Sequence, residues 1–202
     1  MSQTSGPATP GSLVPFQGSQ FLARRKVFKL FGAAFHLYGA DGSLRAYVKQ
    51  KAFKLREAIT VFADETMSTP MLAIQARSII DFSAIYDVTT PEGVRVGSLQ
   101  RKGMKSILRD QWLLMDAQGT TIGQIDEDSM MFALLRRFLS NLIPQAYTFT
   151  VNGSQVATFR QRFNLFVHKF DVDFSPDTQG LLDRRLGVAA VVLLLAIEGR
   201  QG

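Results

Sequence analysis

The chain has 202 residues, of which 46% are hydrophobic, and its 23 Lys and Arg against 17 Asp and Glu give a net charge of +6. This length and composition predict one domain with a single sizeable core. The positive balance favours anionic partners such as acidic lipid or nucleic acid. Because the sequence has no cysteine, disulfides, thiolate metal sites and thiol nucleophiles are excluded.

The N-terminal segment differs in composition from the rest. Residues 1–22 are rich in Ser, Thr, Gly, Pro and Gln, which predicts a disordered tail before a single domain at 23–202. The segment has neither the basic start nor the apolar run of a signal peptide. We therefore expect a cytoplasmic protein, peripheral at a membrane if it binds one.

Short runs of alternating apolar and polar residues follow this tail and predict strands with one wet face. Turn signals separate them, among them Asp41-Gly42, Pro91-Glu92-Gly93 and Asn152-Gly153. Strands this short and closely spaced indicate an antiparallel sheet or barrel. They are predicted at residues 27–31, 34–38, 43–49, 58–62, 71–77, 83–88, 94–100, 107–115, 120–125, 146–151, 155–160 and 165–174.

Two segments carry helical signals. Apolar residues at helical spacing predict a helix over 129–143, either packed over one end of the barrel or lying on a membrane. Residues 186–197 have no polar side chain, so a helix there must be buried on every side. We expect it to begin near Asp177 or Thr178. Its apolar part would span roughly 18 Å, against about 30 Å of bilayer hydrocarbon, which favours a core helix.

Three stretches resemble the LURP-one-related family. Residues 46–62 look like the family's opening signature, 94–102 resemble its strand ending in Arg-Lys, and 147–159 are similar to its later hairpin. The resemblance covers roughly residues 24–197. It implies a tubby C-terminal-like fold, mainly β: a closed antiparallel barrel of about twelve strands around the hydrophobic C-terminal helix. Tubby relatives bind phosphoinositides and scramblase relatives act on bilayers, but a fold does not by itself transfer a function.

A cluster of basic residues is the strongest binding candidate. Several Lys and Arg side chains on one rim can grip a phosphorylated headgroup, although Lys on an edge strand also serves to prevent aggregation. The predicted headgroup-binding residues are Lys49, Lys51, Lys54, Arg56, Arg101 and Lys102, with Lys105 nearby. Arg24, Arg25, Lys26 and Lys29 are expected to reinforce a membrane or nucleic-acid contact, although direct nucleic-acid binding is not favoured.

Other polar residues give weaker signals. The acidic run Asp171, Asp173, Asp177 and Asp183 departs from an EF-hand loop, because Pro176 and Leu182 replace the required Gly and Glu. We expect Asp171 and Asp173 to be outward strand residues and Asp177 to be a helix cap. His36, His168 and Trp112 are expected to be structural strand residues.

The sequence therefore predicts a non-catalytic module without cofactor or metal. It would bind anionic phospholipid, including phosphoinositide, or a protein partner through a basic surface. Scramblase-like lipid transport is the alternative, and a hydrolase is the third possibility.

Overall fold

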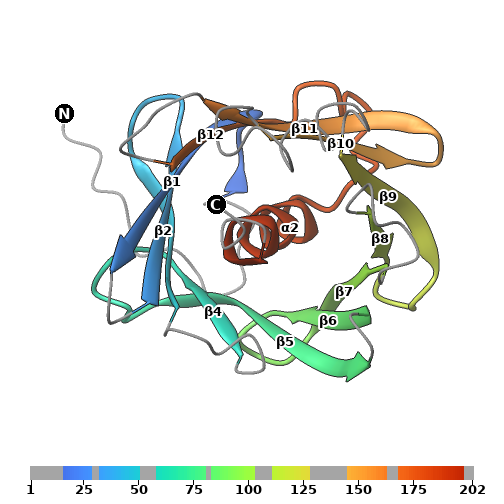
Figure 1. Ribbon diagram of the computed structural model, residues 1–202, viewed down its shortest axis with the longest axis horizontal. Helices are drawn as coiled ribbons and strands as arrows, with labels where there is room; N and C mark the ends of the chain where they lie inside the picture. The colour runs from blue at the N-terminus through green and yellow to red at the C-terminus, as the bar shows by residue number, and fades with distance from the viewer. Residues whose placement is uncertain are drawn as a thin grey trace, which may run out of the picture.

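The computed structural model describes residues 16–28, 32–50, 58–80, 83–102, 111–127, 145–162 and 168–197. Twelve antiparallel strands form a closed barrel in this part of the chain, and one helix runs inside it (Figure 1). The predicted fold class is confirmed.

Each strand pairs with its neighbours in sequence, and β1 pairs with β12 to close the barrel. Closure leaves no strand at an open end of the sheet, which removes a site of aggregation, although β3 and β4 share only the pair Tyr47 and Phe62. The strands are β1 (Gln20–Phe28), β2 (Gly32–Gly39), β3 (Leu44–Gln50), β4 (Ile59–Phe62), β5 (Pro70–Ile80), β6 (Ser83–Thr89), β7 (Arg95–Arg101), β8 (Gln111–Met115), β9 (Thr121–Glu127), β10 (Ala146–Val151), β11 (Ser154–Arg162) and β12 (His168–Asp173).

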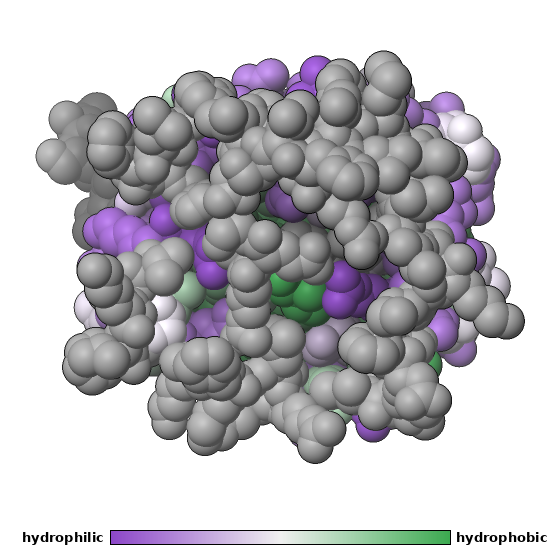
Figure 2. All heavy atoms as spheres, in the orientation of Figure 1, coloured by the Kyte–Doolittle hydropathy of each residue, from purple (hydrophilic) through white to green (hydrophobic). Residues whose placement is uncertain are grey.

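The inner faces of these strands enclose α2 (Arg184–Ile197), whose residues from Leu186 to Ile197 are all buried. Alternation along the strands places large apolar side chains inside, including Trp112, Phe149 and Phe159, each at most 1% exposed. Burying one such side chain contributes about 1.5–3 kcal/mol. In the space-filling view, described atoms at the periphery are mostly hydrophilic, and hydrophobic atoms lie within the ring of strands (Figure 2).

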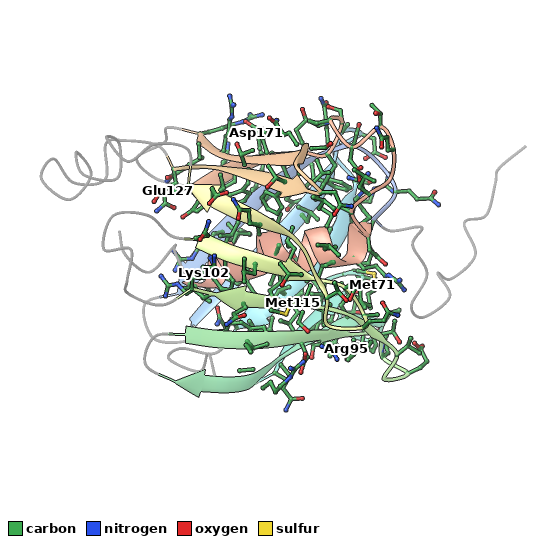
Figure 3. The ribbon with its side chains drawn as sticks, turned by 90° about the vertical axis from the view of Figure 1, so that its right-hand side faces the viewer. Met71, Arg95, Lys102, Met115, Glu127 and Asp171 are labelled. Atoms are coloured by element: carbon green, nitrogen blue, oxygen red, sulfur yellow. The ribbon has the colours of Figure 1, made fainter. Side chains whose placement is uncertain are left out.

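The barrel has two distinct ends, separated along its axis in Figure 3. Tight turns, such as those at Gly42, Gly93 and Gly153, connect strands at the end where α2 begins. We call this the proximal end. At the opposite, distal end, α2 reaches Ile197 and strands finish at Gln50 and Glu127. The figure shows Met71 and Arg95 towards the proximal end and Lys102 and Glu127 towards the distal end.

The turn at Asn152-Gly153 is confirmed, because both residues have positive φ, at 50° and 78°. The predicted start of the C-terminal helix is wrong. Asp177 does not cap a helix: its carboxylate accepts hydrogen bonds from the Leu181 and Leu182 amides, at 2.7 and 3.1 Å, and so closes a turn. The cap is Asp183, whose side chain accepts from the Arg185 amide at 2.9 Å.

The first strand also differs from the expectation, because β1 begins at Gln20 rather than at residue 27. Phe16 is 1% exposed, so residues before position 23 already contribute to the core. The rest of the predicted tail, residues 1–15, lies outside the described residues, as does the helix predicted at 129–143.

Candidate anion-binding surface

The six predicted headgroup residues do not all lie on the outer side of the described barrel. Lys49 is exposed on the outer side of β3, and Lys102 is exposed just after β7. Arg101 pairs with Ala84 and Trp112, both buried in the core, and therefore lies on the inner side of β7. Lys51, Lys54, Arg56 and the adjoining Lys105 lie outside the described residues.

Lys49 and Lys102 do not lie side by side. Three strands, β4, β5 and β6, separate β3 from β7 in the barrel. Neighbouring strands are about 4.8 Å apart, so this separation amounts to roughly 19 Å along the wall. No other described member of the predicted site lies on the strands between them, so the two lysines do not form one continuous basic surface.

Lys49 instead has basic neighbours on the other side, where the barrel closes. In the strand register, Lys49 pairs with Ala34 of β2, and Ala34 pairs with Lys26 of β1. Both lysines are exposed, with the small Ala34 between them. The closure of the barrel thus places two cations on one outer face although they are distant in sequence.

A second row of outward residues runs beside the first. Arg162 of β11 pairs with Lys169 of β12, which pairs with Arg24 of β1, which pairs with His36 of β2. Arg160 is exposed two residues before Arg162 on the same side of β11. We call the basic face the following five outward cations on four strands: Arg24, Lys26, Lys49, Arg160 and Lys169.

The basic face differs from the other charged parts of the barrel in that its cations are not paired. Arg45 pairs with Asp41, Arg185 with Asp183 and Arg162 with Asp171. Arg77 and Arg95 both contact Asp87. Within the described residues, none of the five basic-face cations forms an ion pair with a carboxylate. The acid nearest to them in the strand register, Asp171 opposite Arg160, is itself paired with Arg162.

Aromatic side chains hold part of this face in place. The guanidinium of Arg24 lies 5.1 Å from the centre of the Tyr38 ring, a cation–π contact. The His36 ring stacks on the same tyrosine, with ring centres 6.0 Å apart, and packs edge-on against Tyr47 at 5.0 Å. These contacts restrict Arg24, which reduces the entropy it would lose on binding an anion.

The sequence offered only part of this site. Lys49, Arg24 and Lys26 were candidates from charge clustering, whereas Arg160 and Lys169 were not. The available signal was alternation: Phe159 and Phe170 are inward, so their neighbours Arg160 and Lys169 must point outward. What alternation cannot show is that β12 pairs with β1.

The acidic run before α2 is dispersed among separate contacts. Asp171 pairs with Arg162, Asp173 accepts hydrogen bonds from the amide and hydroxyl of Ser175, and Asp183 caps α2. In the part of the chain that the structure describes, no three His, Asp or Glu side chains are grouped to hold a metal ion. Asp171 and Asp173 lie on β12 at half-buried positions.

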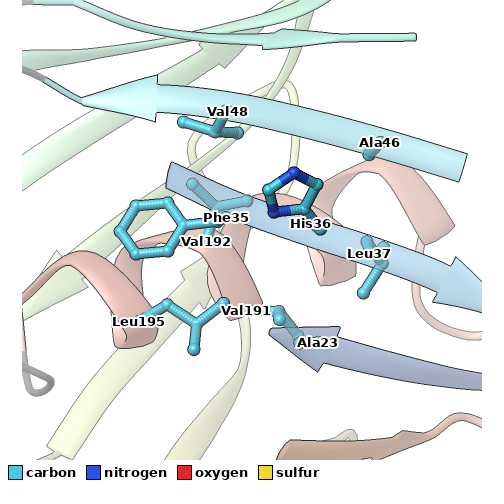
Figure 4. A pocket seen from close by; sticks show the side chains of 9 residues that line it. All are labelled: Ala23, Phe35, His36, Leu37, Ala46, Val48, Val191, Val192 and Leu195. Atoms are coloured by element: carbon cyan, nitrogen blue, oxygen red, sulfur yellow. The ribbon is translucent and has the colours of Figure 1, made fainter. Parts of the chain in front are cut away.

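Between α2 and the wall of β1, β2 and β3 lies a void of about 10 Å³, close to the volume that one water centre requires. Ala23, Ala46 and Val48 face Val191 and Leu195 across it (Figure 4). A void this small is a packing defect rather than a binding site.

The architecture defines the class of protein: a closed antiparallel barrel threaded by an apolar helix, with a basic outer face. The family model of the LURP-one-related proteins matches residues 44–194, most of the chain, and the protein belongs to that family. No curated protein and no solved structure matches the chain. Among the described residues, no helix has the length and apolar character needed to cross a membrane.

Proposed function

We propose that this protein is a non-catalytic module that docks on an anionic phospholipid surface through the basic face. The observation that carries the proposal is the grouping of five cations without acidic partners on adjoining strands, within the described residues. Other arginines of the described wall, including the neighbouring Arg162, are paired with aspartates. Each Lys or Arg near an anionic bilayer contributes about 1 kcal/mol, so five together are enough for reversible attachment.

The extent of the basic face supports a broad partner. The five cations lie on the outer side of a barrel wall, spread over β11, β12, β1 and β3. Such an array matches many headgroups at once. The scramblase-like alternative would require α2 to leave the barrel, in which residues 186–197 are buried.

Vesicle co-sedimentation tests this proposal. The full chain is mixed with neutral phosphatidylcholine vesicles, with vesicles that also contain phosphatidylserine, and with vesicles that also contain a phosphoinositide. We expect binding to both anionic types, lost at high salt because the screening length falls from about 10 Å at 0.1 M to about 3 Å at 1 M. Preference for the phosphoinositide would identify the headgroup.

Variants locate the surface. Lys26→Gln, Lys49→Gln and Lys169→Gln combined should weaken binding by about 100-fold, at about fivefold per charge, with an unchanged melting temperature. Lys102→Gln is the matched control for Lys49→Gln, because both lysines are exposed but lie on different parts of the wall. Equal losses from the two single variants, or no binding to any anionic vesicle, would contradict the proposal and direct the search to protein partners.

A further inference from the structure

His36 lies within the row of outward residues that forms the basic face, yet it is only 3% exposed. Its Nε2 is 2.7 Å from Oε1 of Glu65, in the turn between β4 and β5. Glu65 is 62% exposed. The contact therefore joins a covered imidazole on the barrel wall to a carboxylate at the surface.

The groups around His36 come from each element packed against it. Arg24 is its register partner on β1, and Tyr47 is its partner on β3. Burial and the nearby charge of Glu65 raise the pKa of Tyr47, so this phenol stays neutral at physiological pH. The charged and titratable neighbours are Arg24 on β1, Tyr38 on β2, Arg45, Tyr47 and Lys49 on β3, and Asp64 and Glu65 in the β4–β5 turn.

The charge of this pair depends on one proton. While His36 is neutral, Glu65 adds a full negative charge beside His36 and subtracts from the basic face. When His36 is protonated, the pair is neutral and the face gains one positive charge.

We propose that the His36–Glu65 pair makes the basic face pH-responsive, so that acidification strengthens its attachment to an anionic bilayer. This inference rests on the proposed function. Histidine is the side chain whose charge ordinarily changes between pH 5 and 8. The chain has two histidines and no cysteine, so few side chains compete for the effect.

The test measures binding of the full chain to phosphatidylglycerol vesicles at about pH 7.5 and about pH 5.5, across the range in which histidine titrates. The phosphodiester of this lipid keeps its charge over that range. We expect about fivefold tighter binding at the lower pH, the effect of one added charge. His36→Gln should bind as the unmodified protein does at the higher pH and gain nothing on acidification, whereas His168→Gln should keep the gain.

Glu65→Gln tests the same pair from its exposed side, where substitution leaves the core intact. It removes the negative charge at all pH values, so it should bind about fivefold tighter at about pH 7.5. Glu92→Gln is the matched control: it makes the same formal change in the exposed β6–β7 turn. Glu92→Gln should leave both the affinity and the pH response nearly unchanged.

The outcomes separate the two proposals. No binding at either pH would overturn the proposed function and this inference together. Binding that does not change with pH, a pH response that persists in His36→Gln, or equal effects of Glu65→Gln and Glu92→Gln would overturn this inference alone.

Discussion

The two sides of the barrel wall use the same strands for different purposes. On β6, Tyr86 and Val88 point inward and are at most 3% exposed, whereas Asp87 between them faces outward into a cluster of charged side chains. Inward side chains pack around α2 and determine whether the chain folds. Outward side chains do not fill a core, so their arrangement is open to other requirements.

Within the outer side, two charged regions differ in how their cations are used. On β5–β7, Arg77 donates to Asp87 at 2.7 Å, Arg95 donates to Ser98 at 2.8 Å, and Ser98 donates to Asp87 at 2.8 Å. On the basic face, none of the five cations forms such a pair among the described residues, because the neighbouring acids Asp171 and Glu65 bind Arg162 and His36 instead. Pairing with an acid, rather than exposure, therefore distinguishes a structural charge from one that is available to a partner.

The largest expected effect comes from breaking the inner side. Val192→Asp places an unpaired carboxylate in α2 at a position only 5% exposed, facing the wall of β1–β3. The cost exceeds about 4 kcal/mol, which approaches the whole stability of an ordinary domain. We expect no cooperative thermal transition by circular dichroism.

Val94→Asp is the control for this change, because Val94 is 61% exposed in the β6–β7 turn. The same substitution there should alter the free energy of unfolding by no more than about 0.5 kcal/mol. A soluble Val192→Asp protein that melts close to the unmodified one would refute the enclosed-helix architecture.

A smaller effect is expected where two strands meet. A Cβ at Gly123 of β9 would lie 2.0 Å from the backbone oxygen of Thr150 on β10. Gly123→Ala therefore forces the two strands apart and should cost about 3 kcal/mol in urea unfolding. Gly153→Ala meets no atom within 4 Å and has only its φ of +78° to resist it, so it should cost about 1 kcal/mol. If Gly123→Ala lowers the free energy of unfolding by less than Gly153→Ala does, the pairing of β9 with β10 at this position is not tight.

Much of the inner side could be predicted from the sequence, because apolar periodicity is a local signal. The uncharged run at 186–197 required an enclosing wall, and the alternating strands supplied one. The Asn152-Gly153 turn was predictable because few residues tolerate positive φ.

The prediction failed where the governing contact is not local. The start of the first strand was missed because one of its inward residues is charged: Arg25 is only 9% exposed. Alternation is usually recognised by apolar inward residues, and the run Arg24-Arg25-Lys26 has none. Asp177 was expected to be a cap because it follows Pro176 and Asp is a favoured N-cap residue, but its carboxylate accepts from the Leu181 and Leu182 amides and closes a separate turn. The basic face depends on closure between β1 and β12, which pairs residues from opposite ends of the chain.

The smallest expected effect comes from the charged cluster on the outer side of β5–β7. The Arg77 guanidinium holds the pKa of Asp87 below its usual range, with Ser98 and Arg95 assisting. A carboxyl with a lowered folded-state pKa adds stability that is present above its unfolded pKa, about 3.9, and lost as the pH falls through the folded value. Asp87→Asn should cost about 1 kcal/mol at pH 7, since the pair is partly exposed, and progressively less below about pH 4.

Asp41→Asn, which loses the more exposed partner of Arg45, should cost less than Asp87→Asn in the same urea titrations. A cost for Asp87→Asn that stays constant down to about pH 2 would show that packing, not charge, holds this cluster.

Asp87→Asn also releases two arginines, Arg77 and Arg95, from their shared carboxylate. If pairing is what keeps this side of the barrel from binding anions, Asp87→Asn should bind anionic vesicles more tightly than the unmodified protein. Unchanged binding would mean that the position of a cation on the wall matters more than whether it is paired with a carboxylate.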